Sequence, residues 1–151
     1  MKVYRISKCQ YIDDLSGKGA AMYGGRWNNK GSYVLYTAAT PALALLETVV
    51  HVNTIPVSGY CMATLELPGS NIDILTEKDL PRNWQQNPAP SSHKKIGDRF
   101  IKEGKALALQ VPSAIIPQDH NILINPNHPD FKKLRLVEKR FIPFDERLRK
   151  R

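Results

Sequence analysis

Residues 24–47 have the sequence GGRWNNKGSYVLYTAATPALALLE, which combines a glycine-rich loop, a strand and the start of a helix. Two adjacent glycines allow a positive φ and let a ligand approach the backbone closely. The guanidinium of Arg26 follows at once and can hold two oxygens of a phosphate or carboxylate. The indole of Trp27 can cover neighbouring surface or stack on a flat ring. By themselves, residues 24–28 are either a tight turn with a salt-bridged arginine or an anion-binding loop beside a site for a flat ligand.

The second half of this stretch predicts a strand followed by a helix. β-branched and aromatic residues favour a strand at residues 32–37. Thr40 can cap the helix and Pro41 suits its first turn, so we predict a helix over about residues 42–53, with apolar residues on nearly every side and therefore buried. Glu47 lies on an apolar face of it and must be paired, hydrogen-bonded or protonated. It is either half of a structural Glu–Arg pair or a catalytic carboxylate pointing into a cleft.

The other segments predict more strands with a few helical turns between them. Strands are expected at residues 2–6, 59–67, 71–75, 105–111, 121–125 and 134–144. A helix is expected at residues 93–103 with Ser92 as its cap, and residues 76–79 can form a capped turn. Residues 7–30 show no clear period and contain four glycines, which predicts a long loop. This order of elements, without a regular βαβ cycle, indicates an α+β fold.

Length, charge and cysteine content limit the class of protein. The 151 residues fit one domain, residues 1–151, with a charged tail from about residue 145. The first twenty residues hold no signal-peptide core and no apolar run could span a membrane, so we expect a cytoplasmic protein. Cys9 and Cys61 are expected to be free thiols in a reducing compartment. The net charge of +8 favours a polyanion, an anionic small ligand or an acidic protein partner.

Several familiar catalytic motifs are absent. Without a G-x-S-x-G sequence, Ser113 is not supported as a hydrolase nucleophile, and no phosphate-binding G-x-x-x-x-G-K-[ST] loop is present. His120 and His128 lack further ligands nearby, so no metal site is expected. Arg5 shares a strand face with Val3 and needs a partner or a ligand if that face is buried. The candidates that remain are Arg5, Arg26, Tyr36, Glu47 and Ser113.

Two longer runs resemble a known family. GAAMYGGRWNNKGSYVLYTAATPALALLE at residues 19–47 and VPSAIIPQDHNILINPNHPDF at residues 111–131, with FDERL at residues 144–148, resemble the RES domain, the toxin half of bacterial RES–Xre toxin–antitoxin pairs. The resemblance extends over essentially the whole chain. It implies an ADP-ribosyltransferase-like fold with mixed sheets around an NAD-binding cleft. It also implies an enzyme that breaks the nicotinamide–ribose bond, depletes cellular NAD and arrests growth.

The resemblance assigns roles by motif position. Glu47 is then the catalytic carboxylate that stabilises the oxocarbenium-like ribose, and Arg26 and Tyr36 contribute to catalysis beside it. The substrate-binding residues that it implies are Arg5, Arg26, Tyr36, Ser113 and Asn125. NAD is the substrate, and no cofactor is implied. An Xre-type antitoxin would cover the cleft and make any DNA contact, and a toxin homodimer within that complex is compatible with this arrangement.

The residues leave several functions open. The acceptor of the ribosyl group is water, inorganic phosphate or a protein side chain, and the last would make the protein an ADP-ribosyltransferase. A nucleic-acid-binding or RNA-cleaving protein would instead use the +8 charge and the basic residues of the C-terminal quarter. An interaction module with a purely structural Glu47–Arg pair is the third hypothesis.

Overall fold

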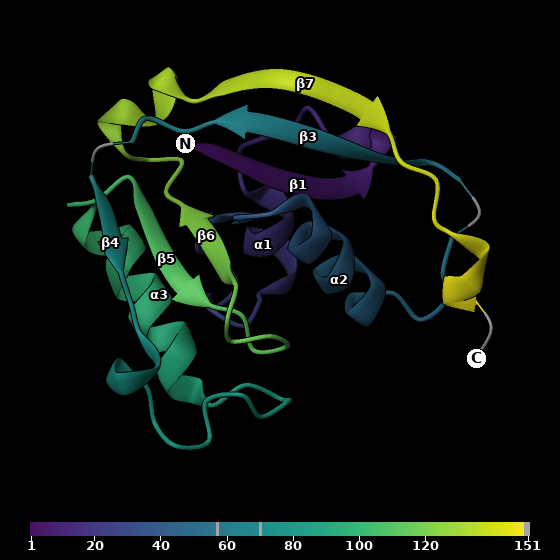
Figure 1. The fold of residues 1–151 in the computed structure, drawn as a ribbon. Helices are drawn as coiled ribbons and strands as arrows, with labels where there is room; N and C mark the ends of the chain where they lie inside the picture. The colour runs from purple at the N-terminus through teal and green to yellow at the C-terminus, as the bar shows by residue number, and fades with distance from the viewer. Residues whose placement is uncertain (57, 70, 150–151) are drawn as a thin grey trace.

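Seven strands form one mixed sheet in the order β4-β5-β6-β2-β1-β3-β7 in the computed structural model, which describes residues 1–56, 58–69 and 71–149 (Figure 1). The strands are β1 (Lys2–Lys8), β2 (Leu35–Ala38), β3 (Tyr60–Glu66), β4 (Ile72–Ile74), β5 (Ala108–Pro112), β6 (His120–Ile124) and β7 (Arg135–Phe141). The helices are α1 (Lys18–Tyr23), α2 (Pro41–His51) and α3 (Ser91–Glu103). The 3-10 turns are η1 (Cys9–Tyr11), η2 (Glu77–Asp79), η3 (Pro129–Lys133) and η4 (Glu146–Arg149).

The sheet consists of two halves that run in different directions. β4 and β5 pair in parallel, and the other pairings are antiparallel. β1 meets β2 at the single pair Tyr4–Ala38, whereas β1 and β3 pair along seven residues. In Figure 1 the β1–β3–β7 half crosses the top of the molecule and the β4–β5–β6 half descends steeply beside it. This limited contact between β1 and β2 lets the sheet fold over a core.

The two faces of the sheet have different neighbours. The face that we call inner carries the largest core cluster, with Val3, Leu65 and Ile122 drawn from both halves. On the opposite face, which we call the helix face, α2 packs Leu43 near Ala38, and α3 packs against the β5–β6 end. Tyr36 and Ala38 alternate with inner-face residues of β2 and so lie on the helix face. Tyr36 therefore lies on the face of the sheet that carries both helices.

Most predicted elements are present, and the α+β prediction is confirmed. Thr40 caps α2, its Oγ1 accepting from the amide of Leu43 at 3.1 Å, and Thr76 and Asp79 form a capping box at η2. Residues 7–30 were expected to be a loop, but they contain η1 and α1. The predicted burial of α2 on all sides is wrong, because Val50 is 56% exposed. Ser92 does not cap α3, because the helix begins at Ser91, two residues before the predicted start, with Pro90 in the N-cap position.

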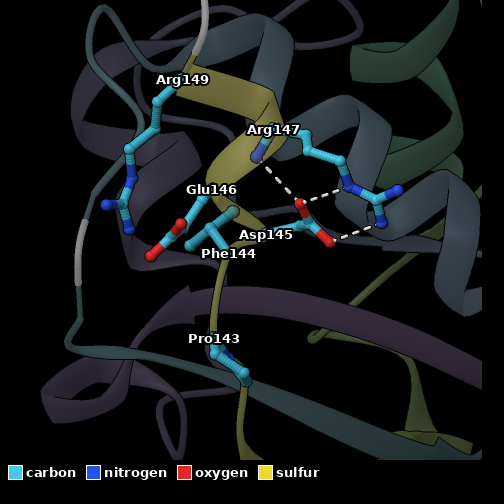
Figure 2. Close-up of a pocket in the computed structure, with 6 residues that line it drawn as sticks. All are labelled: Pro143, Phe144, Asp145, Glu146, Arg147 and Arg149. Atoms are coloured by element: carbon cyan, nitrogen blue, oxygen red, sulfur yellow. Dashed lines mark hydrogen bonds and ion pairs between the residues drawn. The ribbon is translucent and has the colours of Figure 1, made fainter.

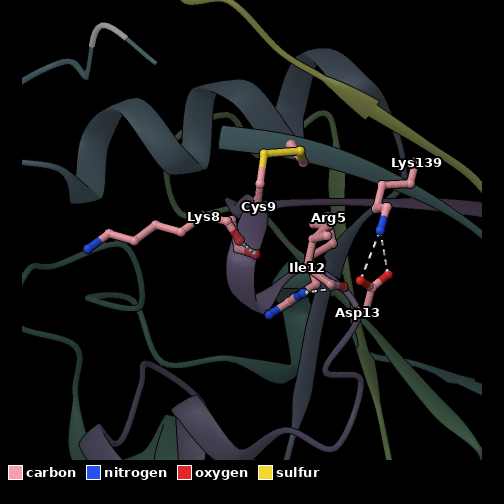
Figure 3. The surroundings of a disulfide bond; sticks show 8 residues. Arg5, Lys8, Cys9, Ile12, Asp13 and Lys139 are labelled. Atoms are coloured by element: carbon pink, nitrogen blue, oxygen red, sulfur yellow. Dashed lines mark hydrogen bonds and ion pairs between the residues drawn. A yellow bond between two sulfur atoms is a disulfide. The ribbon is translucent and has the colours of Figure 1, made fainter. Parts of the chain in front are cut away.

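The expectation of two free thiols is also wrong, because Cys9 and Cys61 form a disulfide (Figure 3). Their Cα atoms lie 4.8 Å apart although 52 residues separate them in the sequence. The antiparallel pairing of β1 with β3 places Ser7 opposite Cys61, and the amide of Cys9 continues the ladder to the carbonyl of Gly59. The register of two strands brings the cysteines together, and their spacing in the sequence carries no sign of it.

Candidate active site

The loop between α1 and β2 is held in one shape by Asn28. This side chain is fully buried, and its Oδ1 accepts from the hydroxyl of Tyr36 at 2.7 Å. Its Nδ2 donates to the carbonyls of Ala20, Asn29 and Ser32. Gly24 has a φ of +71°, and a Cβ on Gly25 would lie 2.7 Å from the Tyr36 hydroxyl, so neither position tolerates a larger residue. The loop that carries Arg26 is therefore a rigid element.

Trp27 packs inside the protein and does not offer its ring to a ligand. It is 2% exposed, and its ring centroid lies 4.6 Å from that of His93 on α3. Asn29, two residues after Trp27, donates from its backbone amide and from its side chain to the carboxylate of Asp98, which is also on α3. Of the two roles open to Trp27, covering neighbouring surface or stacking on a flat ring, this placement favours the first, and the indole anchors the loop to α3.

His93 makes stability depend on pH below neutrality. It is fully buried, burial and then the charge of Arg26 lower its pKa, and its Nε2 has no hydrogen-bond partner within the described residues. As the pH falls below about 6.5, the unfolded chain binds a proton at His93 before the folded chain does. The free energy of unfolding therefore decreases as the pH falls from about 6.5 through the lower pKa that His93 has in the folded chain.

Replacing His93 by phenylalanine should flatten this dependence, because the ring still packs on Trp27 but no longer titrates. Urea unfolding at pH 7.5 and pH 5.5 measures it, with the wild-type chain losing more unfolding free energy than His93→Phe. An equal loss in the two proteins would contradict the assignment.

Arg26 reaches from the loop to the connection between η2 and α3. Its Nη1 donates to the carbonyl of Trp84 at 3.1 Å and its Nη2 to the carbonyl of Gln86 at 3.0 Å. Burial lowers the pKa of Arg26, and the negative charge of Glu47 acts in the opposite direction. Arg26 therefore lies within electrostatic reach of Glu47. Trp84 is buried, so its side chain anchors this connection to the protein.

Glu47 is held by neutral donors. Its Oε1 accepts from Ser113 Oγ at 2.9 Å and from Asn121 Nδ2 at 2.7 Å. No ion pair involves Glu47 across residues 1–56, 58–69 and 71–149, so the structural Glu–Arg pair is not found there. Its carboxylate stands on α2, above the helix face, with one oxygen fixed by two side chains of other elements. Such an arrangement orients a carboxylate for electrostatic work.

Ser113 has no hydrogen-bonding capacity left for a nucleophilic role. It is fully buried, and its Oγ accepts from the amides of Ile115 and Ile116 at 3.1 and 3.3 Å while donating its proton to Glu47. This serine lies where β5 ends at Pro112, so the turn that follows the strand fixes the hydroxyl. In this arrangement Ser113 contacts the carboxylate of Glu47 and positions it.

Two predicted site residues lie elsewhere. Arg5 faces inward on β1, as Val3 does, and its Nη1 donates to the carbonyls of Tyr11 and Ile12, which supplies the partner that its burial requires (Figure 3). Asn125 is buried at the end of β6, where its Nδ2 donates to the carbonyl of Ile101. The structure therefore does not bring Arg5 or Asn125 to Glu47. The residue missed by the sequence argument is Asn121, four positions before Asn125 and about 13 Å along the strand.

Two surface hollows lie away from this cluster. One, of about 640 Å³, is lined by the C-terminal segment from Pro143 to Arg149, where Arg147 pairs with Asp145 and lowers the pKa of that carboxyl (Figure 2). The other, of about 560 Å³, lies beside the disulfide. Neither contains a predicted site residue.

Neither a metal-binding group nor a membrane-spanning helix is found in the described residues. In that part of the chain, no group of three His, Cys, Asp or Glu side chains could hold a metal ion. Its helices are all too short or too polar to cross a bilayer.

Comparison with known proteins places this chain in a family. The model of the RES domain matches residues 2–145. The chain belongs to the RES domain family. A Toxin Res of Yersinia enterocolitica is 38% identical over 152 residues, which cover 99% of this chain and all of that protein. The Prs ADP-ribosylating toxin of a Sphingobium species is 38% identical over 141 residues, which cover 90% and 87% of the two chains.

A solved structure shares the fold of this RES domain. The Mycobacterium tuberculosis MbcT–MbcA toxin–antitoxin complex contains a chain that matches with a TM-score of 0.77 and 19% identity, covering 94% of this chain and 84% of that one. At this identity the likeness concerns the arrangement of helices and strands.

Proposed function

We propose that this RES domain is the toxin of a toxin–antitoxin system and cleaves the nicotinamide–ribose bond of NAD at Glu47. The observation that carries the proposal is the carboxylate of Glu47 on α2, with one oxygen held by Ser113 and Asn121 and with Arg26 in electrostatic reach. The names of the relatives support the assignment as a toxin.

The chemistry of NAD suits a single carboxylate. The nicotinamide is a cationic pyridinium, so the bond from ribose C1′ to its nitrogen breaks with both electrons passing to that nitrogen, and neutral nicotinamide leaves without a general acid. Positive charge develops on the ribose, and Glu47 stabilises it at close range. An acceptor oxygen then bonds to C1′, and where the acceptor is water its proton passes to the solvent. A single carboxylate therefore suffices here, whereas an ordinary glycosidase uses two.

In this proposal Arg26 binds the phosphates of NAD, and Tyr36 supports the loop that carries Arg26. The guanidinium of Arg26 already holds two carbonyl oxygens, and phosphate oxygens of NAD would replace those of Trp84 and Gln86. The Tyr36 hydroxyl accepts from the amide of Trp27 and donates to Asn28, and burial raises the pKa of Tyr36 far above neutrality. Tyr36 therefore stays protonated and supports the loop, and its ring lines the site.

Replacing Arg26 by lysine should weaken NAD binding, because an ammonium group cannot hold two oxygens in one plane as the guanidinium fork does. The KM for NAD is expected to rise by roughly tenfold with a smaller change in kcat. Steady-state kinetics measure both constants. Arg82→Lys, an exposed substitution in the connection that Arg26 contacts, is the matched control and should keep the wild-type KM. An unchanged KM in Arg26→Lys would remove Arg26 from the binding site.

An antitoxin is the proposed partner, since the solved fold relative is part of a toxin–antitoxin complex. An Xre-type antitoxin covering the Glu47 cluster would contact the segments beside it. Exposed apolar side chains are present there, at Tyr23 before the loop and at Ile116 after Ser113. DNA contact then belongs to the partner.

Expression in bacterial cells tests the proposed function. Induction of the wild-type chain is expected to lower the cellular NAD content before growth stops, and Glu47→Gln should leave the NAD content unchanged. Growth arrest at a constant NAD content would contradict NAD depletion.

Modification of a protein target is the second candidate, because one relative is named an ADP-ribosylating toxin. The same carboxylate would serve, with a side chain of the target as the acceptor. Transfer of label from NAD to protein in a cell extract, in place of free ribosyl products, would favour it.

A further inference from the structure

Asn121 contacts Glu47, and neither the sequence motifs nor the family match gives Asn121 a role. It lies on β6 opposite Ala38 of β2 and Val111 of β5. Its Nδ2 donates to Glu47 Oε1 at 2.7 Å, the shorter of the two hydrogen bonds to that oxygen. A small residue, Ala38, stands beside it on the helix face and leaves room for the amide to meet the carboxylate.

The contact has no evident purpose in the fold apart from Glu47. Through residues 1–56, 58–69 and 71–149, the Asn121 side chain makes no other hydrogen bond. By contrast, Asn28 and Asn125 each bind backbone groups and so fix a loop or a strand end. Because this amide donates to the Glu47 carboxylate and to no other group of the described residues, its effect is on the position of that carboxylate.

We propose that Asn121 is a positioning residue that, together with Ser113, fixes Oε1 of Glu47 and presents Oε2 to the substrate. The two donors come from β6 and from the turn after β5, and both point to the same oxygen. Over the described part of the chain, Oε2 accepts no hydrogen bond, so it is the oxygen that meets the ribose. This inference rests on the proposed function, since it concerns the same reaction.

Removing the donor allows the carboxylate to rotate about its last side-chain bond. A displacement of about 1 Å at a catalytic group costs on the order of 100-fold in rate. The rate of the bond-breaking step should therefore fall. Binding of the pyrophosphate and adenosine parts of NAD does not depend on Glu47 and should be retained. Asn121→Ala is therefore expected to lower kcat by roughly 100-fold and to change KM little.

Thr37→Val is the matched control. Thr37 lies on β2, and its Oγ1 donates to the carbonyl of Ile122, the residue after Asn121, at 2.7 Å. Its side chain is buried on the inner face, away from Glu47. This variant removes a hydrogen bond to the same strand and should keep kcat, even where it lowers the melting temperature.

The experiment measures nicotinamide release from NAD by the wild-type chain, by Asn121→Ala, Thr37→Val and Glu47→Gln, and by the double variant that combines Asn121→Ala with Glu47→Gln. The inference expects a loss in kcat for Asn121→Ala alone and no further loss when it is added to Glu47→Gln, because Asn121 acts through that carboxylate. Wild-type kcat in a folded Asn121→Ala protein overturns the inference and leaves the proposed function standing. An equal loss in Thr37→Val also overturns it, because a general effect on β6 would then explain the result. An inactive wild-type chain overturns both.

Discussion

Glu47→Gln is expected to lower nicotinamide release from NAD by roughly 100- to 1,000-fold, the scale of losing one electrostatic contact to the transition state. The substitution keeps shape and hydrogen bonding, because the amide oxygen of glutamine can accept from Ser113 and Asn121 as Oε1 does now. What disappears is the negative charge that faces the developing oxocarbenium ion. The loss should therefore appear in kcat, with NAD binding and melting temperature close to those of the wild-type chain.

Glu103→Gln is the matched control for this prediction. Glu103 ends α3 and makes an exposed ion pair with Lys105 at 3.6 Å. An exposed pair of this kind contributes little to stability, and its neutralisation should leave nicotinamide release unchanged. Full activity in a folded Glu47→Gln protein would remove Glu47 from the mechanism and return it to a structural role.

Gly97→Ala is expected to produce the largest loss of stability, about 3 kcal/mol or more. α3 passes so close to the loop at residues 24–31 that a Cβ on Gly97 would overlap the carbonyl oxygen of Trp27. That oxygen belongs to the backbone of the loop that Asn28 fixes, so no flexible side chain can move to make room. The melting temperature should fall by roughly 10 °C, and Arg26 should lose its position together with the loop.

Gly19→Ala provides the contrast within the same fold. Gly19 lies in α1, and a Cβ there would meet no atom within 4 Å. Alanine favours helix over glycine, so the free energy of unfolding should rise by about 0.5–1 kcal/mol. Thermal unfolding of the two variants beside the wild-type chain measures both effects. A Gly97→Ala protein as stable as the wild-type chain would contradict the close approach of α3 to the loop.

Local signals in the sequence predicted the elements that depend on neighbouring residues. The hydroxyl of Thr40 and the ring of Pro41 fixed the start of α2, and this placed Glu47 on a rigid element before any tertiary contact was known. The exposed side of α2 could not be predicted, because its apolar residues, among them Val50, do not show which of them the sheet covers.

Contacts between distant segments decided two features that the sequence alone could not show. The disulfide depends on the register of β1 against β3, and the seven-residue pairing that sets it appears nowhere in the spacing of the two cysteines. The role of Arg5 as a substrate contact stays a prediction from its motif position. The alternation of β1 turns its side chain toward the inner face with Val3, where the guanidinium donates to the carbonyl of Ile12.

Asn121 could have been found from its strand, and Asn125 shows why it was missed. Both lie in the run NILIN with the same alternation, so the sequence cannot tell which end of β6 is near Glu47. The antiparallel pairing of β6 with β2 decides this, because it sets Asn121 opposite Ala38. The choice between the two asparagines therefore needed the topology of the sheet.

The most direct test of the central claim is to mix the purified chain, free of antitoxin, with NAD and to follow nicotinamide and the ribosyl product with and without inorganic phosphate. We predict nicotinamide release that depends on Glu47, with ADP-ribose formed if water is the acceptor and a phosphorylated product if phosphate is. No release of nicotinamide by the folded chain in either mixture, with or without added cell extract as a source of protein acceptors, would contradict the assignment of this cluster to NAD cleavage.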